Sequence, residues 1–501
     1  MLRSGLFDPY AYAAAADLRG LGEQALIDHY LANPGGPSPQ PRFDASRYST
    51  LAGLAAGVDP FVHFLLHRPA DGLAQDFNSA TYLTENPDVR LDGWEPCRHF
   101  VELGWRQDRL APREPPSDAP DFTGLRGRAA LDGNIDVIVP VYRGRRETLR
   151  AIHSALSARV DADFRLLIID DASPEPALSA DLAKLEALGL VARMANGVNL
   201  GFTATANRGL AAGPGRDKVL LNADCEVHEG WLDTLRAHAY AAGNIGTVTP
   251  LSNAATILSY PIRLRDNHSA LELSHAELAA LAARLPHDTV EIPTGVGFCM
   301  FLRHDCLQAV GAFDEAAFPR GYGEENDFCL RAAKGGWRNL AAIDIFVSHR
   351  GSVSFGEERH QLVQKGLVAM EARHPGYRTQ IADFNRADPL LSVRVQLDIA
   401  RIGRAGHSGR LVHGAEPTTD DLVLRKLPGP ADRFSIFSPH ARSTPNLAPF
   451  GLRQAPQKTA KLLRRLGVDE IVIFEPAIIG QGAVAALRAL ANINKLRFRC
   501  G

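Results

Sequence analysis

The sequence has few cysteines, almost no net charge and no long apolar run. Its six cysteines among 501 residues are scattered without a C-x-x-C pair, which is typical of reduced thiols in a cytosolic protein. A formal net charge of −2 gives no reason to expect nucleic acid as a partner. No apolar stretch reaches the roughly 18 residues that span a bilayer, and the start MLRSGLFDPY lacks a signal-peptide core. We therefore expect a soluble cytoplasmic protein.

The first part of the chain repeats itself. Three similar segments carry an aromatic residue, an Asp or Asn, and a Tyr five residues after the aromatic; they begin at Phe7, Phe43 and Phe77. A histidine followed by an aromatic residue recurs later in each unit, as His29-Tyr30, His63-Phe64 and His99-Phe100. Periods of 36 and 34 residues are typical of stacked helical units. We expect residues 1–111 to be an all-α region of three such units that binds a protein partner or acts as a spacer.

A linker at 112–132 separates this region from a strand–helix alternation over 133–385. Apolar strands are expected at 135–142, 164–173 and 218–227, each followed by a helical pattern. Such alternation predicts a mostly parallel sheet with helices on both faces. In these sheets ligands bind at the carboxyl ends of the strands, where polar residues follow each apolar run here.

One strand end suggests a cation site. Asn222, Asp224 and Glu226 occupy every second position after an apolar run. If the strand geometry continues, their side chains share one face and their oxygens converge, as a hard divalent cation requires. The alternative is a strand end whose acids face water or cap the next helix.

Two glutamates at a helix start and one histidine at a strand end are further candidate functional residues. Glu324 and Glu325 follow two glycines and begin an amphipathic helix, where one carboxylate could face a substrate and act as a base. Alternatively, both glutamates only enrich the first turn of a helix. His349 ends the last apolar strand of this region, a position where a lone histidine is often structural.

The motifs between 133 and 380 resemble glycosyltransferase family 2. They run in the order PVYRGRRETL, IIDDAS, NLGFTATANRG, LLNADCEV, PTGVGFCMFLR, GYGEENDFCLRA and VSHRG. The resemblance implies an inverting, nucleotide-sugar-dependent enzyme with a GT-A-type, Rossmann-like α/β sandwich and a mostly parallel sheet. It also implies a divalent metal cofactor, Mg²⁺ or Mn²⁺.

The same resemblance assigns roles to individual residues. The residues expected at the nucleotide-sugar are Pro140, Val141, Tyr142, Asp170, Asp171, Asn199, Gly201 and Asp224. The expected metal ligands are Asp224, Glu226 and His349, and the expected catalytic base is Glu325, with Glu324 as the neighbouring candidate. Asn222 stands where many family members have aspartate, so the strength of metal binding is left open.

The tail from 386 to 501 has a different character. It is rich in basic residues and prolines up to about 465, and then shows a strand at 470–476 and a helix that begins at GQGAVAALRAL. We interpret this tail as a partial α/β segment, the incomplete start of a second domain that loosely resembles the GT-B type.

The resemblance implies sugar transfer from a UDP-, dTDP- or GDP-sugar to a glycan or lipid-linked acceptor. The family's usual setting is cell-surface polysaccharide or glycan synthesis, which leaves peripheral membrane association open. A sugar-nucleotidyltransferase would need a glycine-rich basic loop after the first strand, where only Gly144 is present. A non-catalytic interaction scaffold with a decayed enzyme domain is the main alternative, because of Asn222 and the short tail.

Overall fold

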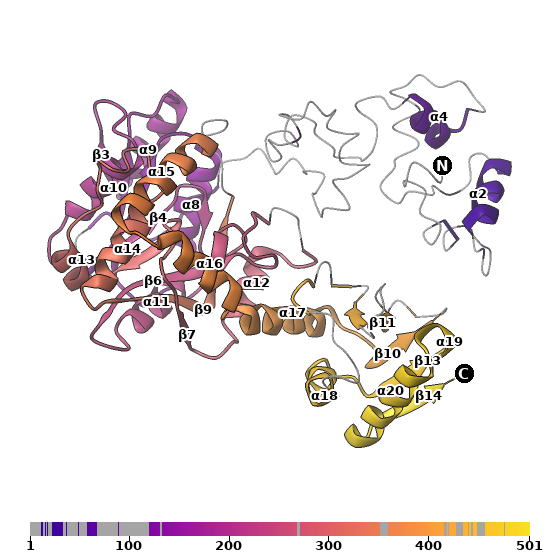
Figure 1. Cartoon of the computed structure of the whole chain (residues 1–501). Coiled ribbons are helices and arrows are strands. Elements are labelled where there is room, and N and C mark those ends of the chain that lie inside the picture. Colours follow the sequence, from indigo (N-terminus) through magenta and orange to yellow (C-terminus); the bar gives the residue numbers. More distant parts are fainter. Residues whose placement is uncertain are drawn as a thin grey trace. The chain divides into compact units, whose positions relative to one another are not determined.

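The structure is a computed structural model (Figure 1). It describes residues 120–130, 133–267, 271–350 and 359–414, most of 418–500, and short pieces of the first 118 residues. The chain divides into two compact units, Met1–Asp118 and Ala119–Gly501.

The described part of the first unit contains two helices, α2 (Glu23–Ala32) and α4 (Pro60–His67). The hydroxyl of Tyr30 in α2 donates to the Asp59 carboxylate at 2.8 Å. Its ring meets that of Phe61 in α4 edge-on, with 6.2 Å between the ring centroids. An aromatic residue of the first predicted repeat thus packs on the second. The third predicted repeat lies almost wholly outside the described residues, so the three-unit array stays a prediction.

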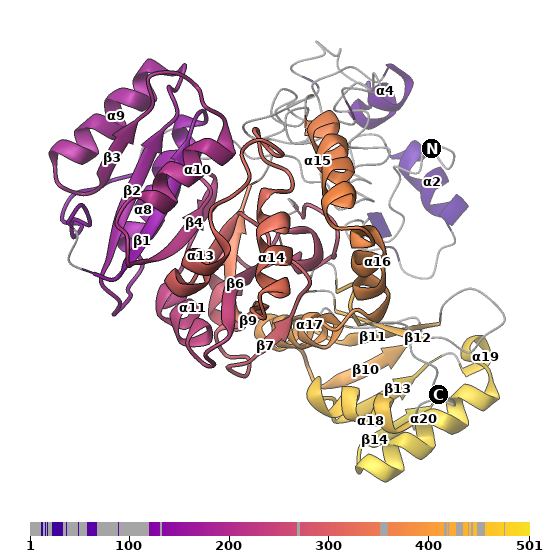
Figure 2. The same ribbon diagram turned by 60° about the vertical axis from the view of Figure 1, so that its left-hand side comes forward.

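Within the described part of the second unit, nine strands form one sheet (Figures 1 and 2). The strands are β1 (Ile135–Val141), β2 (Phe164–Asp170), β3 (Ala192–Ala195), β4 (Asp217–Leu221), β5 (Cys225–Glu226), β6 (Ile245–Ser252), β7 (Thr289–Glu291), β8 (Cys299–Leu302) and β9 (Arg338–His349). Their order is β3-β2-β1-β4-β8-β6-β9-β5, and β7 also pairs with β9. The first four are mutually parallel, and β8 lies antiparallel between β4 and β6. The predicted α/β class is confirmed, but the sheet is mixed and not mostly parallel, because four of its strand pairs are parallel and four are antiparallel.

Helices cover both faces of this sheet. Neighbouring residues of a strand point to opposite sides of the sheet, so each central strand contributes to two cores. Val137 and Val139 belong to a core shared with α8 (Arg145–Ser157), α9 (Pro176–Ala187), α11 (Trp231–Ala239) and α12 (His275–Ala282). Ile138, between them, belongs to the opposite core, with α10 (Phe202–Ala211), α13 (His304–Val310) and α14 (Glu324–Lys334). Among the described helices, none is long and apolar enough to cross a membrane.

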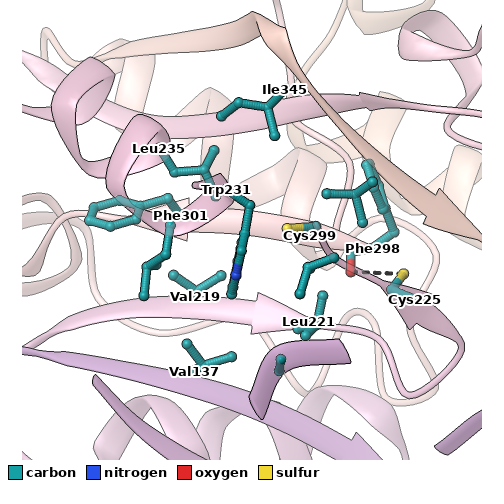
Figure 3. Close-up of a cluster of buried hydrophobic side chains, with 14 of the residues drawn as sticks. Val137, Val219, Leu221, Cys225, Trp231, Leu235, Phe298, Cys299, Phe301 and Ile345 are labelled. Carbon is teal, nitrogen blue, oxygen red and sulfur yellow. Dashed lines mark hydrogen bonds between the residues drawn. The ribbon is translucent and has the colours of Figure 1, made fainter. Parts of the chain in front are cut away.

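The larger core fixes the ends of the central strands (Figure 3). Trp231, at the start of α11, is 2% exposed and packs with Val219 and Leu221 of β4 and with Phe301 of β8. These apolar residues end at Leu221, and the polar residues that follow emerge at the edge of the sheet. The core therefore determines where the polar strand end begins.

The motif PTGVGFCMFLR, residues 293–303, forms a strand only in its second half. Only β8 forms a ladder, and the residues from Pro293 to Phe298 are irregular. A Cβ atom at Gly295 would lie 2.7 Å from the Thr249 hydroxyl oxygen, so only glycine fits there without displacement. The chain thus passes close to β6 and is free to line a cavity instead of pairing.

The pairing of β9 with β6 is irregular after Pro250. Pro250 of β6 pairs with Ala342, but the next residue, Leu251, pairs with Phe346. Residues 343–345 therefore have no partner on β6 and form a bulge. A bulge redirects side chains that a regular strand would place in the ladder.

The tail from 386 is more complete than predicted. After α17 (Leu391–Ala405), the described residues form a second, five-stranded sheet in the order β12-β11-β10-β13-β14. These strands are β10 (Arg410–His413), β11 (Leu422–Lys426), β12 (Phe434–Phe437), β13 (Glu470–Ile473) and β14 (Arg497–Cys500), covered by α18 (Pro456–Arg465), α19 (Pro476–Ile479) and α20 (Gln481–Asn494). Leu411, Ile471 and Leu487 belong to a separate core of this sheet. The segment is thus a small α/β layer with its own interior.

Helix α17 belongs to both cores. Val393 and Leu397 pack into the core of the large sheet, whereas Ile399 and Ile402 pack into that of the small sheet. This helix, which follows the boundary expected at 385/386, therefore contributes to two cores.

A buried ionic network holds α17 in place, and we expect Arg401→Ala to lower the free energy of unfolding by about 3–5 kcal/mol. The Arg401 guanidinium is fully buried, donates to Glu272 at 2.8 Å and lies 3.6 Å from Asp398. Its loss would leave two carboxylates without their cation. Urea denaturation of the full chain measures the change. The matched control is Arg404→Ala, whose pair with Glu277 is largely exposed and should contribute much less to stability. Equal losses in both variants would contradict this role.

Candidate active site

A cavity of about 930 Å³ lies at the carboxyl ends of β1 and β4. Ten of the predicted site residues line it: Pro140, Val141, Tyr142, Asp171, Asn199, Gly201, Asp224, Glu324, Glu325 and His349. Asp170 and Glu226 do not. The cavity combines a polar edge from the strand ends with an apolar wall from helices further along the chain.

Asp170 supports neighbouring elements and does not face the cavity. Its carboxylate accepts hydrogen bonds from the Ser173 amide at 2.9 Å, the Ser179 hydroxyl at 3.0 Å and the Arg193 guanidinium at 2.8 Å. Burial opposes its charge, but these donors outweigh burial and hold the pKa of Asp170 below its ordinary value. The structure therefore places Asp170 as a link between β2, α9 and β3.

Asp171 does line the cavity, but its oxygens are already engaged. They accept from the backbone amides of Leu200 at 2.7 Å and Gly201 at 3.0 Å, and from the Asn196 side chain at 2.7 Å. Gly201 has φ +86°, and a Cβ there would lie 2.5 Å from a backbone oxygen of Pro319. Asp171 thus fixes the turn that leads into α10 and holds it against the cavity.

The strand geometry assumed for Asn222, Asp224 and Glu226 does not continue. β4 ends at Leu221, a turn follows, and β5 then pairs in the antiparallel direction with the end of β9. Glu226 lies 2.9 Å from the Arg150 guanidinium, outside the cavity. The three side chains therefore do not converge, and the structure does not bring Glu226 to Asp224.

His349 takes the place beside Asp224 instead. Its Nε2 lies 3.4 Å from Asp224 Oδ1, and its Nδ1 lies 2.5 Å from the Ala254 carbonyl oxygen. The ring stacks on Phe298, with 5.3 Å between the centroids. Burial disfavours a charged imidazole, but Asp224 outweighs it, so the pKa of His349 is raised above its ordinary value.

This donor set fits a divalent cation. A ring N–H that donates to a carbonyl fixes the imidazole and turns its other nitrogen toward a metal. Cys225 Sγ is also within 4.8 Å of both donor atoms. Burial raises the pKa of the Cys225 thiol well above its ordinary value, and the thiol lies 3.5 Å from the Phe298 carbonyl, so it remains protonated. Of the residues grouped here in the described part of the chain, Asp224 and His349 are thus the candidate metal ligands.

The two glutamates enter the cavity at the start of α14. Gly323 before them has φ +142°, and a Cβ there would lie 2.5 Å from the Phe318 ring. Glu324 is 3% exposed and accepts from the Gly323 amide at 3.1 Å. Among the described residues, the buried Glu325 Oε2 has no hydrogen-bond partner.

The protonation of this pair follows from its surroundings. Burial raises the pKa of both carboxyl groups, and the charge of Glu325 raises the pKa of Glu324 further. Two adjacent carboxylates in a low-dielectric site do not both ionise readily. Glu324 is then the protonated member, and Glu325 the one with an oxygen available to a ligand.

The apolar wall was missed by the sequence analysis. Leu367 and Met370 of α15 (Arg359–Arg373) and Tyr377 of α16 (Tyr377–Ala387) also line the cavity. Asp327, fully buried, anchors this wall: it accepts from His374 at 2.8 Å and from Arg331 at 2.7 Å. The sequence shows that Asp327 is an acidic residue near a helix start, but it does not indicate that Asp327 pairs with His374, which follows α15.

Residues 136–310 match the model of a protein family described as glycosyl transferase family 2. The chain is thus similar to this family over residues 136–310, a segment named here the family 2 domain. The match begins in β1 and ends with α13, so it includes Asp171 and Asp224, whereas Glu325 and His349 lie beyond it.

The family 2 domain also resembles individual proteins. Over 144 residues the chain is 28% identical to "Putative polypeptide N-acetylgalactosaminyltransferase 13" of Drosophila melanogaster, which is 26% of each sequence. The chain thus spans about a quarter of that relative's length. Among solved structures, it resembles "GalNAc-T7 with UDP, GalNAc and Mn2+" (17% identity, 48% of each chain, TM-score 0.38). It also resembles "Mannosyltransferase PcManGT from Pyrobaculum calidifontis in complex with GDP-Man and Mn2+" (17% identity, 64% of this chain and 87% of that one, TM-score 0.37).

Proposed function

We propose that the protein transfers a sugar from a nucleotide-sugar to a hydroxyl group of an acceptor, with inversion at the anomeric carbon. The observation that carries the proposal is the arrangement of one cavity in the family 2 domain. Asp224 and His349 lie on its strand-end side, and Glu325 lines it from the start of α14. Such a displacement needs a cation held by protein ligands and a base, and one cavity contains candidates for both.

The strand ends are the proposed donor side. Pro140, Val141 and Tyr142 end β1 at the cavity, and Arg143 stacks over the Tyr142 ring at 5.2 Å from its centroid. The turn before α10, held by Asp171, adds backbone amides at the start of a helix. We propose that the nucleoside part of the donor lies along Tyr142 and this turn.

Asp224 and His349 are the proposed ligands of a divalent cation, Mg²⁺ or Mn²⁺. When bound, such a cation supplies charge neutralisation for the departing nucleoside diphosphate. Two protein ligands leave the remaining positions of an octahedral ion to phosphate oxygens and water. The buried imidazole is oriented in advance by Ala254, so binding does not have to order it.

Glu325 is the proposed base. It takes the proton from the acceptor hydroxyl as that oxygen forms its bond to the anomeric carbon and the bond to the diphosphate breaks. Its Oε2 is buried and lacks a partner among the described residues, so a ligand hydroxyl can donate to it without displacing a protein contact. Glu324, protonated and bonded to the Gly323 amide, keeps the site from carrying two negative charges.

The acceptor, the sugar and the location in the cell stay predictions. We propose a glycan or lipid-linked acceptor that enters between the 255–290 insertion, the segment that follows β6 in the sequence, and the apolar wall of α15 and α16. Synthesis of cell-surface polysaccharide, cytoplasmic location with peripheral membrane association, and a protein partner on the N-terminal unit remain proposals from the resemblance.

A screen of nucleotide-sugar turnover tests the proposal. The full chain is incubated with Mn²⁺ or Mg²⁺ and a panel of UDP-, dTDP- and GDP-sugars that includes UDP-N-acetylgalactosamine and GDP-mannose. We expect release of nucleoside diphosphate from at least one donor, above the rate without protein. If no donor is turned over and none binds, the non-catalytic scaffold is the better interpretation.

A further inference from the structure

A second group of metal-ligating side chains lies away from the cavity. It consists of His238 in the last turn of α11, His287 between α12 and β7, and Asp344 in the bulge of β9. His238 Nε2 lies 2.7 Å from one oxygen of Asp344, and His287 Nδ1 lies 2.7 Å from the other. The two imidazole rings are stacked, with 4.0 Å between their centroids. Two nitrogens and a carboxylate from three separate elements therefore meet at one point.

The charge in this group is unusual. Asp344 is 7% exposed and His238 is 3% exposed, whereas the His287 side chain is 59% exposed. Among the ion pairs of the described residues, Asp344 has only the two imidazoles as partners and no Lys or Arg. A buried carboxylate is stable only when a positive charge or several donors compensate it. A cation held between the three groups would supply that charge.

The bulge in β9 places Asp344 beside the two histidines. Residues 343–345 form the bulge in which β9 has no partner on β6. Ile345 fills the core beside Leu235 of α11 (Figure 3). His238 follows Leu235 by three residues and so lies on the same face of α11, which packs toward β9. The position of Asp344 against His238 is thus fixed by the core and is not a chance contact of surface side chains.

We propose that His238, His287 and Asp344 form a second metal site, suited to Zn²⁺, that ties α11 and the 255–290 insertion to β9. Two imidazoles and one carboxylate are a zinc ligand set, whereas Mg²⁺ prefers oxygen ligands alone. The exposed side of His287 leaves the fourth position to water. Asp344 and His349 are five residues apart, roughly 15 Å along an extended strand, so this site is separate from the catalytic pair. The site goes beyond the proposed function and does not depend on it.

Zinc titration of the full chain tests the site. The protein carries Asp224→Ala and His349→Ala, so that the catalytic pair contributes no metal ligand, and is stripped with a chelator before calorimetric titration with Zn²⁺ alone. We expect binding of one equivalent and a rise in melting temperature, because a ligand that binds only the folded state stabilises it. Adding His287→Ala should weaken zinc binding at least about tenfold and abolish the rise. His287 is exposed, so this change should not disturb folding.

The matched control is His275→Ala, an exposed histidine of the same insertion that is outside the group. It should bind zinc as its parent does. Asp344→Asn, which keeps the shape of the side chain, should weaken zinc binding as His287→Ala does. Equal zinc affinity in the His287→Ala protein and its parent would overturn the proposal, as would the absence of a zinc-dependent shift in the parent. In either case the two imidazoles only share a hydrogen-bonded carboxylate.

Discussion

Glu325→Gln should lower the rate of sugar transfer about a hundredfold or more and leave the affinity for the nucleoside diphosphate nearly unchanged. Glutamine keeps the size and polarity of the side chain but cannot accept the acceptor's proton. Donor binding uses the strand ends and the cation, which Glu325 does not contact. Transfer is measured with the donor identified by the screen, and nucleotide affinity by calorimetry.

The pH dependence of transfer gives a second measurement of the same group. A base must be deprotonated to act, and burial raises the pKa of Glu325 above its ordinary value. Transfer should therefore decline, as the pH falls, at a higher pH than an exposed carboxylate would give. This acid limb should be absent from the residual activity of Glu325→Gln.

Two glutamate variants serve as controls for Glu325. Glu291→Gln removes a carboxylate that is 61% exposed and pairs with Arg338, so transfer should be unchanged. Glu324→Gln replaces a group that is already protonated, so its effect should be smaller than that of Glu325→Gln. A collapse of transfer in Glu324→Gln with normal transfer in Glu325→Gln would reverse the roles of the pair. Normal transfer in both would exclude this pair from the chemistry.

Asp224→Ala should reduce donor turnover by about a hundredfold to a thousandfold, the usual effect of removing a charge that stabilises the leaving group. The expected physical reason is loss of the cation, since His349 alone is a poor site for Mg²⁺ or Mn²⁺. Turnover in the parent protein should likewise stop in excess chelator and return with added Mn²⁺. The measurement is nucleoside diphosphate release as a function of metal concentration.

Glu226→Gln is the matched control for Asp224→Ala. Glu226 is two residues away in sequence but pairs with Arg150 outside the cavity, so its loss should change the metal requirement little. An effect as large as that of Asp224→Ala would mean that the strand end rearranges when metal binds. Full turnover by the parent protein in excess chelator would contradict the cation site itself.

The positions of the polar strand ends could be predicted, but their side-chain directions could not. The apolar runs before Tyr142, Asp171 and Asn222 located three neighbouring strands, and parallel strands bring their carboxyl ends to one edge of the sheet. The expected convergence of Asp224 and Glu226 required the strand to continue. It ends at Leu221 because β5 has to turn back to pair with His349, more than 120 residues later, and local periodicity carries no information about that pairing.

Helix α17 was not predicted from the sequence, and the reason is different. Arg394, Asp398 and Arg401 all lie on its buried side, at the spacing of one helix face. Charged residues at buried positions remove the contrast between an apolar and a polar face, so the pattern looked aperiodic. Their partners, such as Glu272 and Asn446, come from other parts of the chain and could not be inferred from the local sequence.

Helix α17 belongs to two cores, and this limits where the gene for this protein can recombine with other genes. Recombination between genes usually preserves function when the break falls where few contacts cross it. A break near 385 would remove Val393 and Leu397 from the large core, and a break after α17 would remove Ile399 and Ile402 from the core of the small sheet. The small sheet is therefore expected to be inherited together with the family 2 domain, whereas a break at the division after Asp118 is expected to leave both cores of the second unit intact.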